Sequence, residues 1–278
     1  MASPVAVGGG ALGAAAVGVG GAYLAGAFEG SGSSKVETEP EIVLLLNEFN
    51  SSSVYATAGL IGKDYGHYLV APIGSRGEND SKIDNQKWWK RSYERWQEDS
   101  KSANNSLSAE FKNGQINSPF SSSAATSDSP KALNQVCEAV YKKNKSSLGY
   151  EANAADNPTK LKNDLFRYCS IFGELKTIGE VSTETYANTK KGFDSAKIKI
   201  FIAVTGNDKF WEIRNKEFYA ADGDKSKSNA KGNSSKFKEK SEANPNSKIR
   251  DICREAYESD KSDANNYPDD EISRFCVL

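Results

Sequence analysis

The sequence has little of what metal sites and common catalytic motifs require. Its 278 residues include a single histidine, His67, and its four cysteines form no C-x-x-C pair, so the ligands of a typical zinc site are not clustered. No serine lies within a G-x-S-x-G turn, although the residue counts alone do not exclude a Ser-His-Asp arrangement. His67 follows Gly66 in a turn-like region, where a lone histidine is usually a surface residue. We therefore predict that the protein is not an enzyme and has no catalytic, cofactor-binding or metal-binding residues.

The chain also lacks an excess of charge of either sign. Lys and Arg together number 36 and Asp and Glu number 37. This balance is unlike that of a nucleic-acid-binding protein, and we expect no nucleic-acid partner. One local exception is the stretch 225–240, which holds six lysines and one glutamate. We interpret it as a solvated loop, and contact with anionic lipid or a sialylated host surface by charge alone is the alternative.

Charged side chains are missing from the first 28 residues, and the first one is Glu29. Residues 1–28 are mostly Ala and Gly with scattered Val and Leu, and roughly 20 apolar residues suffice to span a bilayer. The segment has no basic n-region, but Ala25–Ala27 fits the small-x-small pattern of a cleavage site. A G-x-G-x-x-G pattern at Gly8–Gly13 lacks the full preceding strand of a dinucleotide-binding turn. We predict a signal or transmembrane segment at 1–28, either retained as an anchor or cleaved, and a soluble Gly-rich arm is the remaining alternative.

Amphipathic helical patterns dominate the rest of the chain, behind a flexible linker at 29–37. Apolar residues at helical spacing predict helices that begin near positions 85, 130, 157, 210 and 249, and a last short turn near 272. A capping pattern around Pro40 predicts a short helix over 42–49. The fold class is therefore mainly α with minor β.

The segments between these helices are predicted from alternation and composition. Residues 50–80 read as short strands or irregular structure, with Tyr68–Val70 as one apolar run. The alternating Ile198, Ile200 and Ile202 predict a strand that ends near Gly206. The stretches at 100–129 and 221–247 are rich in Ser, Asn and Lys, and we predict mobile linkers there because they have too little apolar area to pack.

Three segments in the second half of the chain resemble three in the first half, in the same order. WWKRSYERW (88–96) resembles WEIRNKEFY (211–219), VCEAVY (136–141) resembles ICREAY (252–257), and DLFRYC (164–169) resembles EISRFC (271–276). The shared order indicates an internal duplication, although similar amphipathic helices can also arise separately. Trp211 can be matched with either Trp88 or Trp89. We predict a Gly/Ala-rich N-terminal membrane segment followed by two related small helical units, at 38–176 and 177–278.

The four cysteines lie on the apolar faces of the predicted helices. The duplication favours Cys137 with Cys169 and Cys253 with Cys276 as candidate disulfides, one for each unit. In the chain-entropy description each closed loop would contribute roughly 3–4 kcal/mol. Buried free thiols are the alternative, because disulfides require an oxidising location.

These features together resemble the large paralogous families of uncharacterised surface proteins in haemotropic mycoplasmas. The resemblance rests on the small-residue N-terminal segment, the Lys/Ser/Asn-rich body with W…R helices, and a helix that ends in an aromatic residue and a cysteine. Tyr168-Cys169 and Phe275-Cys276 stand where those proteins often have Trp-Cys. The resemblance implies a surface-exposed protein of variable sequence on a wall-less cell, and it carries no biochemical activity.

The predicted function is that of a membrane-anchored or exported surface protein with an interaction or antigenic role. Its predicted partners are the membrane, through residues 1–28, and a host or other cell-surface protein. Its predicted location is the cell membrane with an extracellular ectodomain, or the medium after secretion. An exported hydrolase or a small-ligand-binding protein with an unrecognised site is the alternative, and a structural coat component is a third. A deep pocket that holds His67 beside an acidic partner would favour the hydrolase.

Overall fold

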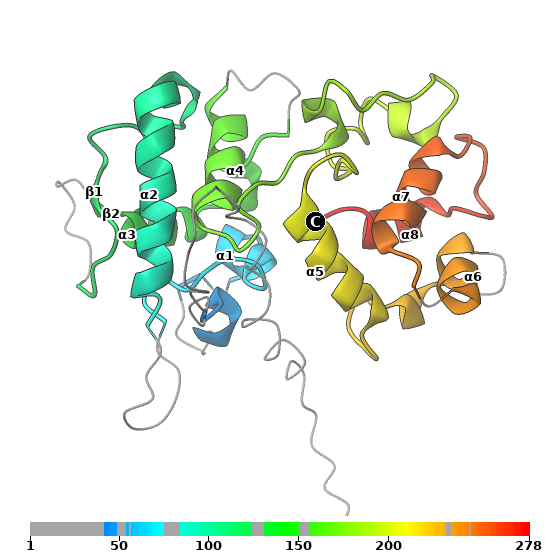
Figure 1. Cartoon of the computed structure of the whole chain (residues 1–278), viewed down its shortest axis with the longest axis horizontal. Coiled ribbons are helices and arrows are strands. Elements are labelled where there is room, and N and C mark those ends of the chain that lie inside the picture. Colours follow the sequence, from blue (N-terminus) through cyan, green and yellow to red (C-terminus); the bar gives the residue numbers. More distant parts are fainter. Residues whose placement is uncertain are drawn as a thin grey trace, which may run out of the picture.

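A computed structural model describes residues 42–48, 54–55, 57–74, 84–123, 131–150, 156–231, 235–244 and 246–278. These residues form a mainly α-helical fold with a minor β component (Figure 1). The predicted membrane segment at 1–28 and the linker at 29–37 lie outside the described residues. Within the described ranges, no helix is both long enough and apolar enough to cross a bilayer.

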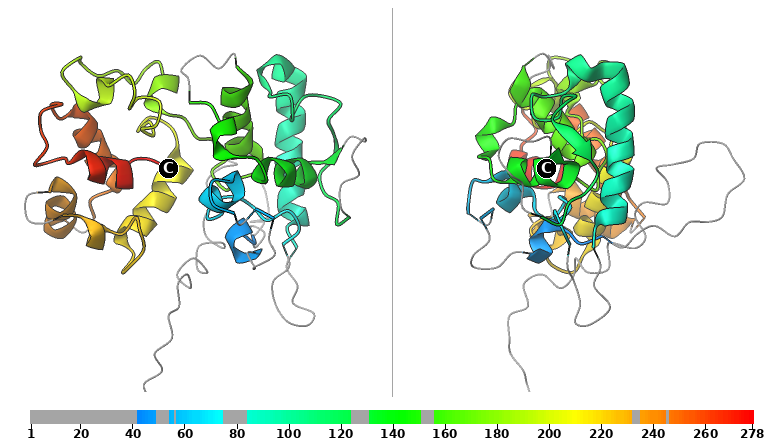
Figure 2. Two further views of the ribbon diagram at one scale, coloured as in Figure 1. Left: turned by 180° about the vertical axis from the view of Figure 1, so that it is seen from behind. Right: turned by 90° about the vertical axis from the view of Figure 1, so that its left-hand side faces the viewer.

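The helices follow one another in two sets, one in each half of the chain. The first half contains α1 (Ile61–Tyr65), α2 (Gln86–Ala103), β1 (Ile116–Ser118), β2 (Lys131–Ala132), α3 (Leu133–Tyr141) and α4 (Asn157–Tyr168). The second half contains α5 (Asp208–Tyr219), α6 (Lys236–Ala243), α7 (Ile249–Glu258) and α8 (Asp269–Phe275). Views from opposite sides place α1–α4 on one side of the molecule and α5–α8 on the other (Figure 1, Figure 2). The two short strands pair in parallel.

Local capping explains where α3 and α4 begin. Asp156 accepts a hydrogen bond from the backbone N–H of Thr159 at 3.1 Å, and a proline follows in the first turn of α4. α3 begins at Leu133, later than the predicted start near 130, because Ala132 belongs to β2. The Gln135 side chain then accepts from Ala132 N at 2.9 Å and satisfies one of the free N–H groups at the helix start.

The same hydrogen bonds anchor α2 and α5. The indole Nε1 of Trp89 donates to the carbonyl of Ala71 at 3.2 Å, and that of Trp211 donates to the carbonyl of Ala203 at 2.8 Å. Both indoles are buried, with 0% and 3% of Trp89 and Trp211 exposed. The equivalent contacts match Trp211 with Trp89 rather than with Trp88.

An asparagine one turn earlier repeats in the same way. In the first half, Asn85 Nδ2 donates to the carbonyls of Val43 and Ala71, both at 2.8 Å, and its Oδ1 accepts from Val43 N at 2.9 Å. In the second half, Asn207 Nδ2 donates to the carbonyls of Lys176 and Ala203 at 2.8 and 2.9 Å, and its Oδ1 accepts from Lys176 N at 2.8 Å. Each amide therefore ties the start of a long helix to an extended segment that precedes it in the chain.

The cysteine helices also use equivalent contacts. Disulfides join Cys137 to Cys169 and Cys253 to Cys276, with Cα atoms 5.7 and 5.8 Å apart. Beside each bond, a buried tyrosine hydroxyl donates to two carbonyls, from Tyr141 to Val70 and Cys169, and from Tyr257 to Ile202 and Cys276. The disulfide pairs are those that the internal duplication favours.

A buried carboxyl group holds a loop onto the last helix of each half. Asp164 accepts a hydrogen bond from Ser108 N at 2.7 Å. Glu271 accepts from Lys231 N at the equivalent position and also from the hydroxyl of Ser235. The two carboxyl groups thus occupy corresponding sites on α4 and α8.

Two predictions of regular structure are wrong. Within the predicted helix at 42–49, of which the structure describes 42–48, Val43 and Leu45 make backbone hydrogen bonds with Ala71 and Leu69, and only Leu45–Glu48 form a 3-10 turn. Residues 198–206 do not form a continuous strand. The N–H groups of this segment bond back to Asp194 and Lys197, as in a turn, and only isolated bridges form at residues 201–202.

The prediction that the polar stretches at 100–129 and 221–247 do not pack is also wrong for their described parts. Phe111 and Phe237 are each 0% exposed. Phe111 packs against the ring of Tyr168 with centroids 5.6 Å apart, and Phe237 packs against Phe275 at 5.1 Å. Each stretch is therefore attached to the core by an aromatic side chain in a mostly polar sequence.

Candidate functional site

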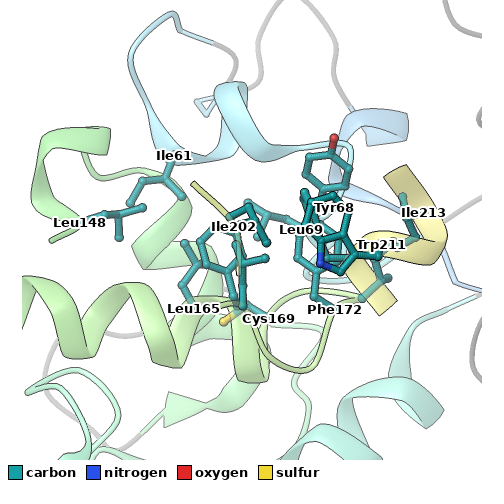
Figure 3. Close-up of a cluster of buried hydrophobic side chains, with 14 of the residues drawn as sticks. Ile61, Tyr68, Leu69, Leu148, Leu165, Cys169, Phe172, Ile202, Trp211 and Ile213 are labelled. Atoms are coloured by element: carbon teal, nitrogen blue, oxygen red, sulfur yellow. The ribbon is translucent and has the colours of Figure 1, made fainter. Parts of the chain in front are cut away.

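The apolar core continues from one half of the molecule into the other. Figure 3 shows Tyr68 and Phe172 of the first half beside Trp211 of the second half. The rings of Phe172 and Phe210 lie 5.6 Å apart in an edge-to-face arrangement. The two halves are thus in direct contact through buried aromatic side chains.

A buried polar network lies at the same contact. Arg214 of α5 is 0% exposed, and its guanidinium binds Glu217 at 2.9 Å and the Tyr68 hydroxyl at 3.3 Å. The Tyr68 hydroxyl in turn donates to Glu217 at 3.0 Å. Burial raises the pKa of Tyr68, which therefore stays a neutral donor. Burial alone would lower the pKa of Arg214, but its contacts with Tyr68 and Glu217 raise it, so the guanidinium remains charged.

A pocket of about 450 Å³ opens between the halves. Its walls are mostly apolar, and the side chains that line it from the two halves include Leu148, Leu175, Ile200, Ile202 and Val277. The loop at 144–146 lines it as well. A volume of this size falls within the range of roughly 300–1,000 Å³ that is usual for small-molecule sites.

The polar wall of this pocket is built around Lys162 on α4. The Lys162 side chain is 1% exposed, and its Nζ lies 2.5 Å from Glu180 Oε2 in the second half. The same carboxylate oxygen accepts from the backbone N–H and the hydroxyl of Thr177, at 2.8 and 3.0 Å. Burial lowers the pKa of Lys162, and the charge of Glu180 opposes this effect. The ion pair therefore joins the two halves at the edge of the pocket.

Two tyrosines complete the polar wall. The hydroxyls of Tyr65 and Tyr150 lie 3.0 Å apart within hydrogen-bonding distance, and both residues line the pocket. Lys162 Nζ lies 5.7 Å from the centre of the Tyr150 ring, within the range of a cation–π contact. Burial raises the pKa of Tyr150, so its hydroxyl is protonated at neutral pH. The pocket thus combines apolar walls with a cluster of N–H and O–H donors.

The residues that the sequence singles out lie elsewhere. His67 is exposed and does not line the pocket, although the Glu217 carboxylate lies close enough to affect it. Burial of part of its ring lowers the pKa of His67, and Glu217 opposes this shift. The Trp88, Trp89 and Trp96 side chains are 6%, 0% and 4% exposed, so they belong to the core rather than to a ligand platform. Among the described residues, no group of three or more His, Cys, Asp or Glu side chains is placed to hold a metal ion.

The lysine-rich stretch 225–240 is partly ordered against the second half. Its described part includes α6 and the buried Phe237, so it is not wholly a solvated loop. Exposed ion pairs join Lys231 to Asp270 and Lys240 to Glu255. Such pairs contribute at most about 1 kcal/mol each, and the aromatic contact of Phe237 is the larger attachment.

Lys162 and Glu180 are functional candidates that the sequence-based reasoning missed. Lys162 lies four residues before Phe166, which is 0% exposed, so it extends an apolar stripe on α4. A lysine on the buried side of a helix is a recognisable signal, because lysine is rarely buried without a partner. Glu180 has no comparable signal, because its role depends on how the second half is placed.

Comparisons with protein-family models, with curated proteins and with solved structures give no match to this chain.

Proposed function

We propose that this protein is a non-catalytic surface protein that residues 1–28 carry into or through the membrane. Its ectodomain takes part in interactions at the cell surface or is exposed there as an antigen. The observation that carries the proposal is the state of the cysteines: all four of the chain are bonded, in one disulfide on each side of the molecule. Structural disulfides persist mainly in oxidising locations outside the cytoplasm. The uncharged run to Phe28 supplies the means of export.

The architecture that we propose is a duplicated module behind the membrane segment, with units at 38–176 and 177–278. The repeated asparagine, tryptophan, tyrosine, disulfide and carboxyl contacts support the duplication. Lys176 makes the contact with Asn207 that Val43 makes with Asn85, which supports a boundary between the units close to residue 176. The resemblance to the surface-protein families of haemotropic mycoplasmas is part of the same proposal.

The pocket favours a second candidate, a surface protein that binds a small ligand. It has the volume and the mixed apolar and polar lining of a small-molecule site. This candidate has the same location as the first but differs in what it binds.

Protease treatment of intact cells that express the full chain tests the location. If residues 29–278 face outward, a protease that does not cross membranes degrades them without cell lysis. A matched variant that lacks residues 1–28 should resist the protease until the cells are lysed. Full-length protein that survives in intact cells, beside a degraded external marker, would rule out a surface location.

A further inference from the structure

The Lys162 ammonium group has more hydrogen-bond donors than the described part of the protein satisfies. An ammonium group has three N–H donors, and within the described part of the chain Lys162 donates only to Glu180. Its side chain is 1% exposed, so bulk water does not surround the remaining donors. Leaving buried donors of a charged group without acceptors is costly. Because Lys162 lines the pocket, an acceptor in the pocket would complete its coordination.

The tyrosine pair adds a further donor on the same wall. Tyr65 and Tyr150 share one hydrogen bond at 3.0 Å. Two phenols have two hydroxyl protons, so, among the residues that the structure describes, one proton remains available for another acceptor. Glu180 faces Lys162 and Thr177 with the same oxygen and is not among the residues that line the pocket. The polar wall of the pocket therefore presents N–H and O–H donors. A ligand group that only accepts hydrogen bonds, such as a carboxylate, would match them.

The other walls of the pocket are apolar, so a matching ligand must also have an apolar part. Leu148, Leu175 and Ile202 are buried, and Ile200 is one of the large apolar side chains that the described part of the protein leaves exposed, at 40%. At roughly 30 Å³ for each water-sized group, a volume of about 450 Å³ accommodates about 15 non-hydrogen atoms. An unbranched carboxylate of about 10 to 12 carbons meets both conditions.

We propose that the pocket between the two halves binds a medium-chain aliphatic carboxylate, with its head group at Lys162 and the tyrosine pair and its chain along Leu148, Ile200 and Ile202. The carboxylate accepts the free N–H groups of Lys162 and the free tyrosine proton. The Lys162–Glu180 pair stays in place, and the ligand adds acceptors to it. Burial of the chain supplies the apolar part of the affinity. This inference does not depend on where the protein is located, so it can fail or hold independently of the proposed surface role.

Photolabelling of the full-length protein, in whichever cell fraction contains it, tests the site directly. The probe is decanoate with a diazirine at the end of the chain, and the labelled peptides are identified by mass spectrometry. Labelling is expected in the peptides that contain residues 144–150 and 200–202, and unmodified decanoate should compete with it. Decylamine has the same chain with a cationic head, and it should compete about tenfold less well or worse because it cannot accept from Lys162.

Two variants separate the apolar from the polar part of the site. Ile200→Trp fills the pocket from a partly exposed position and should abolish labelling of the pocket peptides. Ile73→Trp makes the same change at another exposed isoleucine, which is 36% exposed and outside the pocket, and should leave labelling unchanged. The double variant Lys162→Met/Glu180→Gln removes both charges together, and it should raise the half-saturating decanoate concentration about tenfold to a hundredfold.

Lys191→Met is the control for the removal of a buried lysine. Lys191 is 2% exposed, pairs with Asp269 in the second half, and does not line the pocket. Its variant should label like the parent. If the double variant does not fold, Ile200→Trp and decylamine still decide the question. Labelling that is spread over surface peptides, that persists in Ile200→Trp, or that decylamine suppresses as well as decanoate would overturn the proposal.

Discussion

The paired asparagines Asn85 and Asn207 allow a comparison of the same substitution at two equivalent sites. Replacing either with alanine removes the three hydrogen bonds that each side chain makes. The carbonyls of Ala71 and Ala203 still accept a hydrogen bond from the indole of Trp89 or Trp211. The main loss is therefore that the N–H group of Val43 or Lys176 no longer has its side-chain acceptor. A buried unsatisfied group of this kind costs about 1–3 kcal/mol. With the lost packing, we expect each alanine variant to be destabilised by about 2–4 kcal/mol.

The backbone conformation distinguishes the two sites. Asn207 has a φ of 55°, in the left-handed region, and it is the only non-glycine residue with a positive φ in the described part of the chain. Alanine in that conformation costs about 1–2 kcal/mol, whereas glycine adopts it freely. The Gly variant should therefore be more stable than the Ala variant at position 207. Relative to the same comparison at position 85, this advantage should be larger by at least about 1 kcal/mol.

Urea unfolding of the four variants, followed by tryptophan fluorescence, provides the assay. The midpoint is converted to free energy with the slope of the parent, provided that the slopes agree. An equal difference between Gly and Ala at both positions would refute the backbone argument. Alanine variants as stable as the parent would refute the role of the two amides as ties between segments.

Removal of either disulfide by a double Cys→Ser change should destabilise the protein by about 3–4 kcal/mol in the chain-entropy description, because the bonds close loops with sequence separations of 32 and 23 residues. Urea unfolding midpoints measure this loss, and a loss below about 1 kcal/mol for both disulfides would contradict the prediction. Burial raises the pKa of Asp164 to about 7, so the folded state favours the protonated form of this side chain. The stability that this preference contributes is fully present below about pH 4. It is lost as pH rises through 7, which lowers the free energy of unfolding by up to roughly 4 kcal/mol. Asp164→Asn should flatten the stability profile between pH 4 and 7, and an unchanged profile in this variant would refute the assignment. Lys191→Met should alter stability by no more than about 1 kcal/mol in a thermal melt, because the apolar methionine replaces the buried methylene chain of the lysine and the partner Asp269 is 56% exposed. A loss above about 3 kcal/mol would show that the fold needs the ion pair.

Apolar periodicity correctly predicted the helices that bury one apolar face. α3, α4 and α7 lie where apolar residues recur at helical spacing. Cys137 and Cys253 lie on α3 and α7, and their partners Cys169 and Cys276 directly follow the ends of α4 and α8. The predicted duplication was enough to favour one of three disulfide pairings, because equivalent helices are expected to face equivalent cores. It did not decide between Trp88 and Trp89, because both are buried, at 6% and 0% exposed.

The errors arise where the backbone turns on itself or where distant segments make contact. The alternation of Ile198, Ile200 and Ile202 is typical of a strand, but the backbone there turns on itself and Ile200 faces the pocket. The stretches rich in Ser, Asn and Lys were predicted to be mobile because of their composition, yet Phe111 and Phe237 anchor their described parts. A single aromatic residue scarcely changes the composition of a long polar segment, but it determines where that segment packs.

The pocket was not predictable from the sequence for the same reason. Its lining comes from both halves of the chain, and Lys162 and Glu180 are separated by 18 residues. No local sequence pattern predicts that the side chains of Lys162 and Glu180 form an ion pair. Only the placement of one half against the other brings the apolar walls and the donors together.

Disulfide mapping of the full-length protein recovered from the cells that make it tests both the exported location and the one disulfide in each half. Free thiols are blocked before lysis, and the peptides are analysed by mass spectrometry without reduction. Our account predicts linked peptides that join Cys137 to Cys169 and Cys253 to Cys276, with no blocked cysteine. Four blocked thiols would contradict the exported location, and a link between Cys137 and Cys253 would contradict one disulfide for each half.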